Sequence, residues 1–163
     1  YLNYFLKMEK KKNVLLDQGG IITDVYNSTK FYENPYIILI YRDPRDIFSE
    51  FKQKVAYSYP KEDVNIFCKW YQKLINNIKN QNFEKLNMLK INFEDFVLNH
   101  NDTVQKISNF LSEDLTTPLE NFDLSRPKSN LQKFKKLLNN LEVSTIETLL
   151  EKDLYFKKNE YKD

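Results

Sequence analysis

The chain has 163 residues, of which 41% are hydrophobic and 15% aromatic, which suits one domain with a single hydrophobic core. Its net charge of +2 is too small to predict nucleic acid or a membrane surface as the partner. The single cysteine excludes an internal disulfide and fits a reducing compartment, and no apolar run approaches the roughly 20 residues of a membrane span. We therefore expect a cytoplasmic protein.

The start of the chain indicates a piece of a longer protein. The chain begins at Tyr1 rather than at a methionine, and residues 1–12 resemble the lysine-ended tail of an amphipathic helix. We expect residues 1–163 to form a single, N-terminally truncated domain. The apolar run 13–17, followed by Gly19 and Gly20, predicts a buried strand and a loop. Because the sequence holds no other glycine, these residues cannot assemble a glycine-rich phosphate-binding loop.

The middle of the chain alternates strand and helix patterns. Residues 36–41, YIILIY, predict the clearest strand, and residues 88–92 predict a weaker one. Between them lie apolar residues at helical spacing, which predict one buried helix face: Val64, Phe67, Tyr71, Leu74, Ile75 and Ile78. Trp70 and Tyr71 both follow this helical spacing, which favours core packing for the pair over stacking on an acceptor. The alternation is typical of a parallel sheet in an α/β fold.

After residue 92 the pattern is mostly helical. Asp102 with Gln105 and Ser144 with Glu147 predict two capping boxes, each at the start of a helix. The single histidine, His100, lies in a polar stretch before the first of these helices, and we expect it to be exposed and structural.

The segment RDPRD, residues 42–46, predicts a sharp change from strand to helix. Asp43 is a favourable N-cap, Pro44 suits the first helical position, and Asp46 falls in the first turn, where a carboxylate interacts well with the helix dipole. Arg45 also falls in that turn, where we expect it to be solvated or paired with a nearby carboxylate.

Arg42 stands at the carboxyl end of the strand, which is where open α/β sheets bind their ligands. With Ser49 on the following helix, its guanidinium could hold a phosphate through charge-assisted hydrogen bonds. The alternative is that Arg42 forms a salt bridge with Asp43, Asp46 or Glu50.

Three stretches together resemble the sulfotransferases that use 3′-phosphoadenosine 5′-phosphosulfate (PAPS). IILIYRDPRDIFSEF resembles their 3′-phosphate-binding strand and helix, and LKINFEDFVLNHNDTVQKISNFL resembles their strand, Tyr-Glu-Asp and helix segment. SRPKSNLQKFKKLL resembles their late loop and helix. The resemblance covers most of residues 13–155 and implies a three-layer α/β fold, with a central parallel sheet flanked by helices and a helical C-terminal part.

The resemblance implies that Arg42 binds the 3′-phosphate and that Ser49 adds a hydroxyl. The family usually places this serine eight residues after the arginine, whereas Ser49 follows by seven and Glu50 occupies the eighth position. Phe93 stands where the family often has tyrosine and could pack near adenine. A core phenylalanine at the end of a strand is the alternative for Phe93.

The resemblance assigns further roles in the late segment and near the start. Arg126 and Lys128 could close over the nucleotide phosphates, while Ser129 could either join them or simply cap the helix that carries Leu131, Phe134 and Leu138. Asp17 could take the proton from an attacking hydroxyl, or it could bond only to loop amides.

We therefore expect the carboxyl-terminal part of a sulfotransferase that uses PAPS and needs no metal. The acceptor would be a hydroxyl or amine of a small molecule or a carbohydrate. A phosphosulfate-binding loop would have to lie upstream, because sulfuryl transfer requires a preorganised anion site. Two alternatives remain: a noncatalytic nucleotide-binding or interaction domain, and a phosphotransferase of the P-loop superfamily.

Overall fold

A computed structural model of the chain describes residues 25–30, 32–53, 60–80, 86–115 and 123–151. The predicted strand at residues 13–17 lies outside these ranges. The elements in chain order are α2 (Val25–Thr29), β1 (Tyr36–Tyr41), α3 (Pro44–Gln53), α4 (Val64–Lys79), β2 (Asn87–Asn92), α5 (Phe93–Leu98), α6 (His100–Leu111), α7 (Ser125–Lys128), α8 (Phe134–Leu137) and α9 (Asn140–Leu149).

The two strands form a parallel pair, as the sequence predicts. Tyr36 lies opposite Asn87 at one end of the pair, and Tyr41 lies opposite Asn92 at the other. The carboxyl ends of both strands therefore meet at one edge, where α3 and α5 begin. The described residues form a helix-rich α/β fold with a two-stranded parallel sheet. The three-layer arrangement around a larger central sheet stays a prediction.

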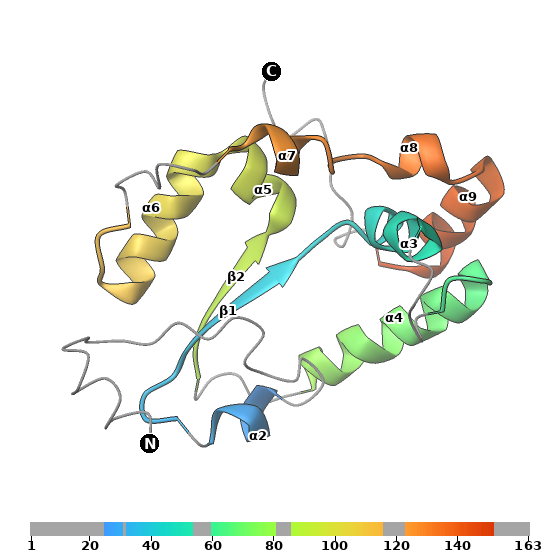
Figure 1. Cartoon of the computed structure of the whole chain (residues 1–163). Helices are drawn as coiled ribbons and strands as arrows, with labels where there is room; N and C mark the ends of the chain where they lie inside the picture. The colour runs from blue at the N-terminus through green and yellow to red at the C-terminus, as the bar shows by residue number, and fades with distance from the viewer. Residues whose placement is uncertain (1–24, 31, 54–59, 81–85, 116–122, 152–163) are drawn as a thin grey trace.

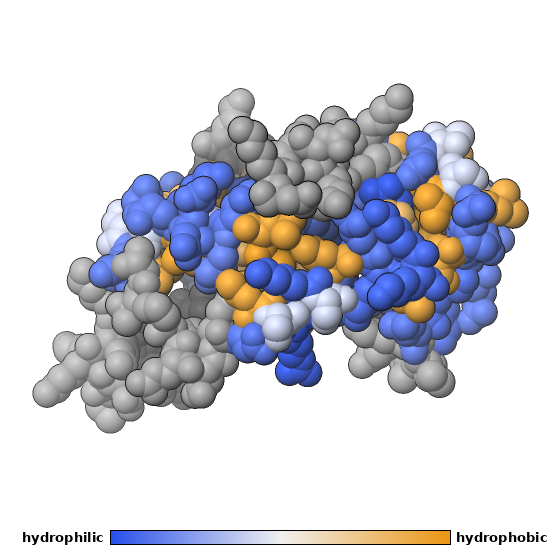
Figure 2. Space-filling view, turned by 90° about the horizontal axis from the view of Figure 1, so that it is seen from above, coloured by the Kyte–Doolittle hydropathy of each residue, from blue (hydrophilic) through white to orange (hydrophobic). Residues whose placement is uncertain are grey.

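The helices lie in two groups beside the strand pair. Helices α5 and α6 lie on one side, and α3, α4, α8 and α9 lie on the other, with α7 above the carboxyl ends of the strands (Figure 1). Seen from that end, hydrophobic residues gather near the centre of the visible face and hydrophilic residues cover much of its two sides (Figure 2). Of the helices in the described ranges, none is both long and apolar enough to cross a membrane.

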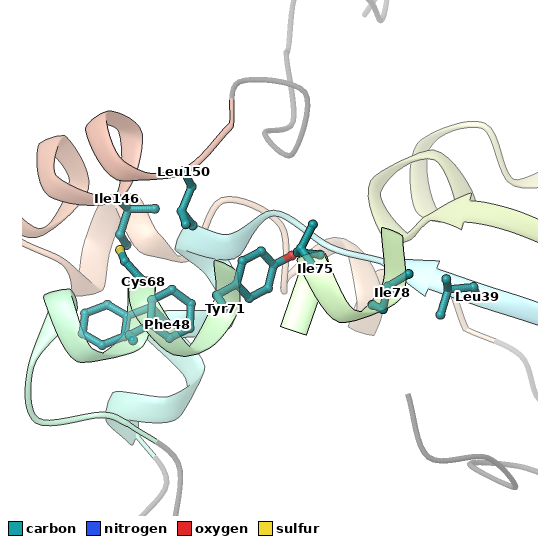
Figure 3. Close-up of a cluster of buried hydrophobic side chains, with 9 residues drawn as sticks. Leu39, Phe48, Cys68, Tyr71, Ile75, Ile78, Ile146 and Leu150 are labelled. Carbon is teal, nitrogen blue, oxygen red and sulfur yellow. The ribbon is translucent and has the colours of Figure 1, made fainter. Parts of the chain in front are cut away.

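The main core lies between α4 and the elements packed on it. Helix α4 buries the face that the sequence predicts, and Asp63 caps its first turn by accepting hydrogen bonds from two backbone amides. Leu39 of β1, Phe48 of α3 and Ile146 of α9 meet this face (Figure 3). Aromatic packing extends the core, since the Phe67 and Tyr71 rings stack with their centroids 5.7 Å apart. Core packing of Tyr71 and Trp70 is thus confirmed.

The predicted capping box at Ser144 and Glu147 is wrong. Helix α9 begins earlier, behind Asn139, which forms a capping box with Glu142. The Asn139 side chain accepts from the Glu142 amide at 2.9 Å, and the Glu142 carboxylate accepts from the Asn139 amide at 3.0 Å. Ser144 lies inside the helix, and its hydroxyl donates to the Leu141 carbonyl. Two cap motifs compete here, and the upstream one starts the helix.

The predicted capping box at Asp102 and Gln105 is also wrong. Helix α6 begins at His100, directly behind Asn99, so Asp102 lies within the first turn rather than before it. Gln105 donates to the Asn109 side chain one turn later. His100 is half-buried and not exposed as expected, because its ring packs edge-on against Phe96 of α5. The helix start is thus set by the junction with α5.

Candidate functional site

The turn between β1 and α3 is fixed by Asp43. Its side chain accepts a hydrogen bond from the Arg45 amide at 2.9 Å, and its carbonyl accepts from the Ile47 amide. Its own amide donates to the Glu94 carboxylate of α5 at 2.9 Å. The predicted N-cap is therefore confirmed. This contact also joins the ends of the two strands, because Glu94 follows β2 closely.

Arg42 lies where β1, α5 and the segment after α7 meet. One terminal nitrogen, Nη1, donates to Oε2 of Glu50 at 3.0 Å, and the other, Nη2, donates to the Asn130 carbonyl at 2.9 Å. The guanidinium carbon stands 5.0 Å from the centre of the Phe93 ring. The Arg42 side chain is 16% exposed, and its Nε is buried without an acceptor in the described part of the chain. The salt bridge with Glu50 is thus formed, and Arg42 retains an unused donor.

Buried carboxylates surround this arginine. Asp46 accepts from the Gln132 amide at 2.8 Å and from the Phe134 amide at 3.0 Å, so α3 holds the segment that leads into α8. Burial raises the pKa of Asp46 and of Glu94, although backbone hydrogen bonds and the charge of Arg42 act in the opposite direction. The site therefore combines one partly accessible guanidinium with buried negative charge.

Arg45 is paired with carboxylates, one of its two expected states, and only a small part of it is solvated. Its Nη2 lies 2.6 Å from Oδ2 of Asp43, and its Nη1 lies 2.5 Å from Oε1 of Glu147. Its guanidinium carbon stands 4.2 Å from the centre of the Phe134 ring. Burial alone would lower the pKa of Arg45, but its contacts with Asp43 and Glu147 outweigh burial and raise it. Arg45 is therefore an internal link between α3, α8 and α9.

Two further residues predicted for the nucleotide site, Ser49 and Phe93, lie close to Arg42 in the chain or in space. Ser49 is fully buried, and its hydroxyl donates to the Asp46 carbonyl at 2.8 Å within α3. Phe93 begins α5 and places its ring against the Arg42 guanidinium. The structure brings Phe93 to Arg42, while the Ser49 hydroxyl is engaged inside its own helix. The roles of both residues toward a nucleotide stay predictions.

The late segment differs from the prediction at Ser129. Ser129 follows the short helix α7 as its C-cap, and its hydroxyl donates to the Arg126 carbonyl at 2.8 Å. It does not cap the next helix, because α8 begins only at Phe134, behind Lys133. Arg126 and Lys128 are both exposed on α7. The contact from this region to Arg42 comes from the backbone of Asn130.

Two hydrogen-bond partners of residues 42–46 were not predicted from the sequence. The Asn130 carbonyl belongs to the backbone, so its residue type gives no signal of the contact. Glu94 lies inside the NFEDF stretch, and its position directly after a strand end could have indicated a role. Asp17, the candidate base, lies outside the described residues. Within the described ranges, no three His, Cys, Asp or Glu side chains come together as metal ligands.

A comparison with known protein families gives a match. A sequence model of the Sulfotransferase family matches residues 24–117, which is more than half of the chain. The chain belongs to the sulfotransferase family. In this member of the family, the matched part runs from α2 to beyond α6 and includes Arg42, Ser49 and Phe93. Asp17 and the α7 residues lie outside it. The searches found no matching curated protein and no matching solved structure.

Proposed function

We propose that this chain carries the 3′-phosphate-binding half of a sulfotransferase site that uses PAPS, with Arg42 as the residue that binds the phosphate. The observation that supports the proposal is the state of the Arg42 guanidinium. It lies at the carboxyl end of β1, and its buried Nε lacks an acceptor among the described residues. A phosphate there would bind the guanidinium through charge-assisted hydrogen bonds.

The surrounding residues suit a nucleotide in this position. Phe93 offers an aromatic ring beside Arg42, which fits packing near adenine. Arg126 and Lys128 are exposed cations on α7, and α7 packs against α5. They could therefore reach phosphate groups held at Arg42, with the exposed Ser129 hydroxyl beside them. Ser49 would have to release the Asp46 carbonyl to contact the phosphate, because its hydroxyl donates there.

The proposed reaction moves a sulfuryl group from PAPS to a hydroxyl or amine of a small molecule or carbohydrate. The bond between sulfur and the bridging phosphate oxygen breaks as the acceptor attacks, and a base removes the acceptor's proton. Asp17 is our candidate for that base. The phosphosulfate itself requires a loop that the sequence of this chain does not supply. A cytoplasmic location, and the absence of nucleic acid and membrane partners, belong to the same proposal.

The salt bridge between Arg42 and Glu50 favours a second candidate, a noncatalytic domain that keeps only part of the nucleotide site. In that case the guanidinium would serve chiefly to join the end of β1 to α3 through Glu50. A pure interaction domain would not recognise the 3′-phosphate, so nucleotide binding separates it from the proposal. A noncatalytic domain that still binds the nucleotide would differ from the proposal in transferring no sulfuryl group from PAPS.

Calorimetric titration of the chain with 3′,5′-ADP and with 5′-AMP tests the proposal. We expect 3′,5′-ADP to bind at least about tenfold more tightly, because only this nucleotide offers a 3′-phosphate to Arg42. Arg42→Ala should remove roughly 1.5 to 3 kcal/mol of that binding, the range for a hydrogen bond to a charged group. Lys52→Ala is the matched control, since Lys52 is a cation of α3 paired with Glu142 rather than with the site.

The folded state of each variant is checked by circular dichroism before the titration. Equal affinity for the two nucleotides in the unmodified chain would remove the basis for a 3′-phosphate site. Equal loss of affinity in Arg42→Ala and Lys52→Ala would show that any preference comes from general positive charge rather than from Arg42.

A further inference from the structure

We infer that Glu50 determines the affinity and specificity of the site by competing with the nucleotide phosphate for Arg42. This inference rests on the proposed function. Glu50 lies on α3, and its carboxylate Oε2 is 3.0 Å from Nη1 of Arg42. A carboxylate and a phosphate bind a guanidinium through the same charge-assisted geometry, so both require the same donors.

Glu50 is the exchangeable partner of Arg42. The Arg42 contact with Asn130 uses a backbone carbonyl, and Asp46 holds the same segment through two further amides. The Asn130 carbonyl therefore cannot leave Arg42 unless the backbone around it moves. The Glu50 side chain is 30% exposed, and in the described part of the chain Arg42 is its hydrogen-bond partner. Rotation of one side chain into solvent therefore exposes the guanidinium to a ligand.

The negative charge around Arg42 makes this exchange unfavourable. Asp46 and Glu94 also lie within electrostatic range of Arg42. Asp43 adds a further buried carboxylate, although Arg45 pairs with it. A phosphate that binds Arg42 must displace the Glu50 carboxylate and then remain near it, because the two compete for one guanidinium. Neighbouring like charges disfavour binding, so Glu50 should weaken the site for any anion.

This competition also determines which ligands bind. An anion that forms only one weak hydrogen bond with Arg42 binds it less tightly than Glu50 does and therefore cannot displace the Glu50 carboxylate. A doubly charged phosphate brings more negative charge to Nη1 than the singly charged Glu50 carboxylate does, so it can replace that carboxylate there. Glu50 should therefore raise the selectivity for a phosphate monoester over singly charged anions such as sulfate esters, while lowering the affinity for all of them.

The test compares Glu50→Gln and Glu50→Ala with the unmodified chain in titrations with 3′,5′-ADP and 5′-AMP. Both variants remove the charge, and Glu50→Gln also keeps the size of the side chain. We expect 3′,5′-ADP to bind about tenfold more tightly to each variant, the effect of removing one close like charge. Binding of 5′-AMP should remain unchanged. Glu151→Gln is the control, because it removes a carboxylate from an exposed ion pair with Lys79, away from Arg42.

The double variant Arg42→Ala with Glu50→Gln shows whether the gain acts through Arg42. We expect the gain to vanish in this background, since the phosphate then has no guanidinium to bind. A gain that persists there, or affinity in both Glu50 variants no higher than in the unmodified chain, would overturn the inference. If Arg42→Ala alone weakens binding while the Glu50 variants do not strengthen it, the role of Glu50 fails and the proposed function stands.

Discussion

Replacing Arg45 with alanine removes the guanidinium that joins three helices, and we expect a large loss of stability. The Asp43 carboxylate is 1% exposed, so it would lose its charged partner while it remains buried. We assign this loss about 2 to 3 kcal/mol, below the usual range for a fully buried pair because the Arg45 side chain keeps 13% exposure. The contact with the Phe134 ring adds about 0.5 to 1 kcal/mol. The exposed Glu147 partner adds little.

Equilibrium unfolding in urea measures this prediction. We expect Arg45→Ala to lower the free energy of unfolding by about 3 kcal/mol with little change in its dependence on urea. Arg45→Lys should recover only part of the loss, since a lysine cannot form the forked contact with Asp43. Lys52→Ala, which breaks a salt bridge between α3 and α9, should cost less than about 1 kcal/mol. A loss below about 1 kcal/mol for Arg45→Ala as well would contradict this prediction and indicate that Arg45 forms only a weak, solvent-exposed ion pair.

Three further predictions concern stability and reactivity. Burial raises the pKa of Asp46 above its ordinary 3.8, so the folded chain keeps a proton that the unfolded chain has lost. Lowering the pH toward 3.8 should therefore raise the free energy of unfolding of the unmodified chain relative to that of Asp46→Asn, as measured by urea titrations at several pH values. A fall in this difference at lower pH would contradict the raised pKa. Burial raises the pKa of the Cys68 thiol to about 11, so iodoacetamide at pH 8 should modify it only after unfolding, as followed by mass spectrometry; rapid labelling of the folded chain would contradict its burial. Asn139→Ala should cost about 1 kcal/mol in thermal or urea unfolding through loss of the α9 cap, whereas Asn140→Ala, one residue later, should have little effect.

Local sequence patterns predict the elements that carry Arg42. An uncharged run of β-branched and aromatic residues forms β1, and apolar residues at helical spacing form the buried face of α4. Asp43 caps α3 because Asp followed by Pro is favourable at a helix start in almost any context. These features depend on neighbours within a few residues, so the sequence is enough to find them.

Contacts between distant segments were not predictable in the same way. Arg45 was expected to be solvated or paired with a nearby carboxylate, but its distant partners Phe134 and Glu147 were not predicted, because both approach only when α8 and α9 pack against α3. The Asn130 carbonyl reaches Arg42 for the same reason. The patterns at Asn139 and at Ser144 both satisfy the local rule for a capping box, and α9 begins at the upstream one, so the local rule alone does not choose between them.

The most direct test of the central claim is a crystal structure of the chain with 3′,5′-ADP. Our account predicts the 3′-phosphate within hydrogen-bond distance of Arg42 Nη1, with the Glu50 carboxylate rotated away and the Phe93 ring beside the nucleotide. A structure in which the nucleotide binds elsewhere, while Arg42 keeps its hydrogen bond to Glu50, would contradict it.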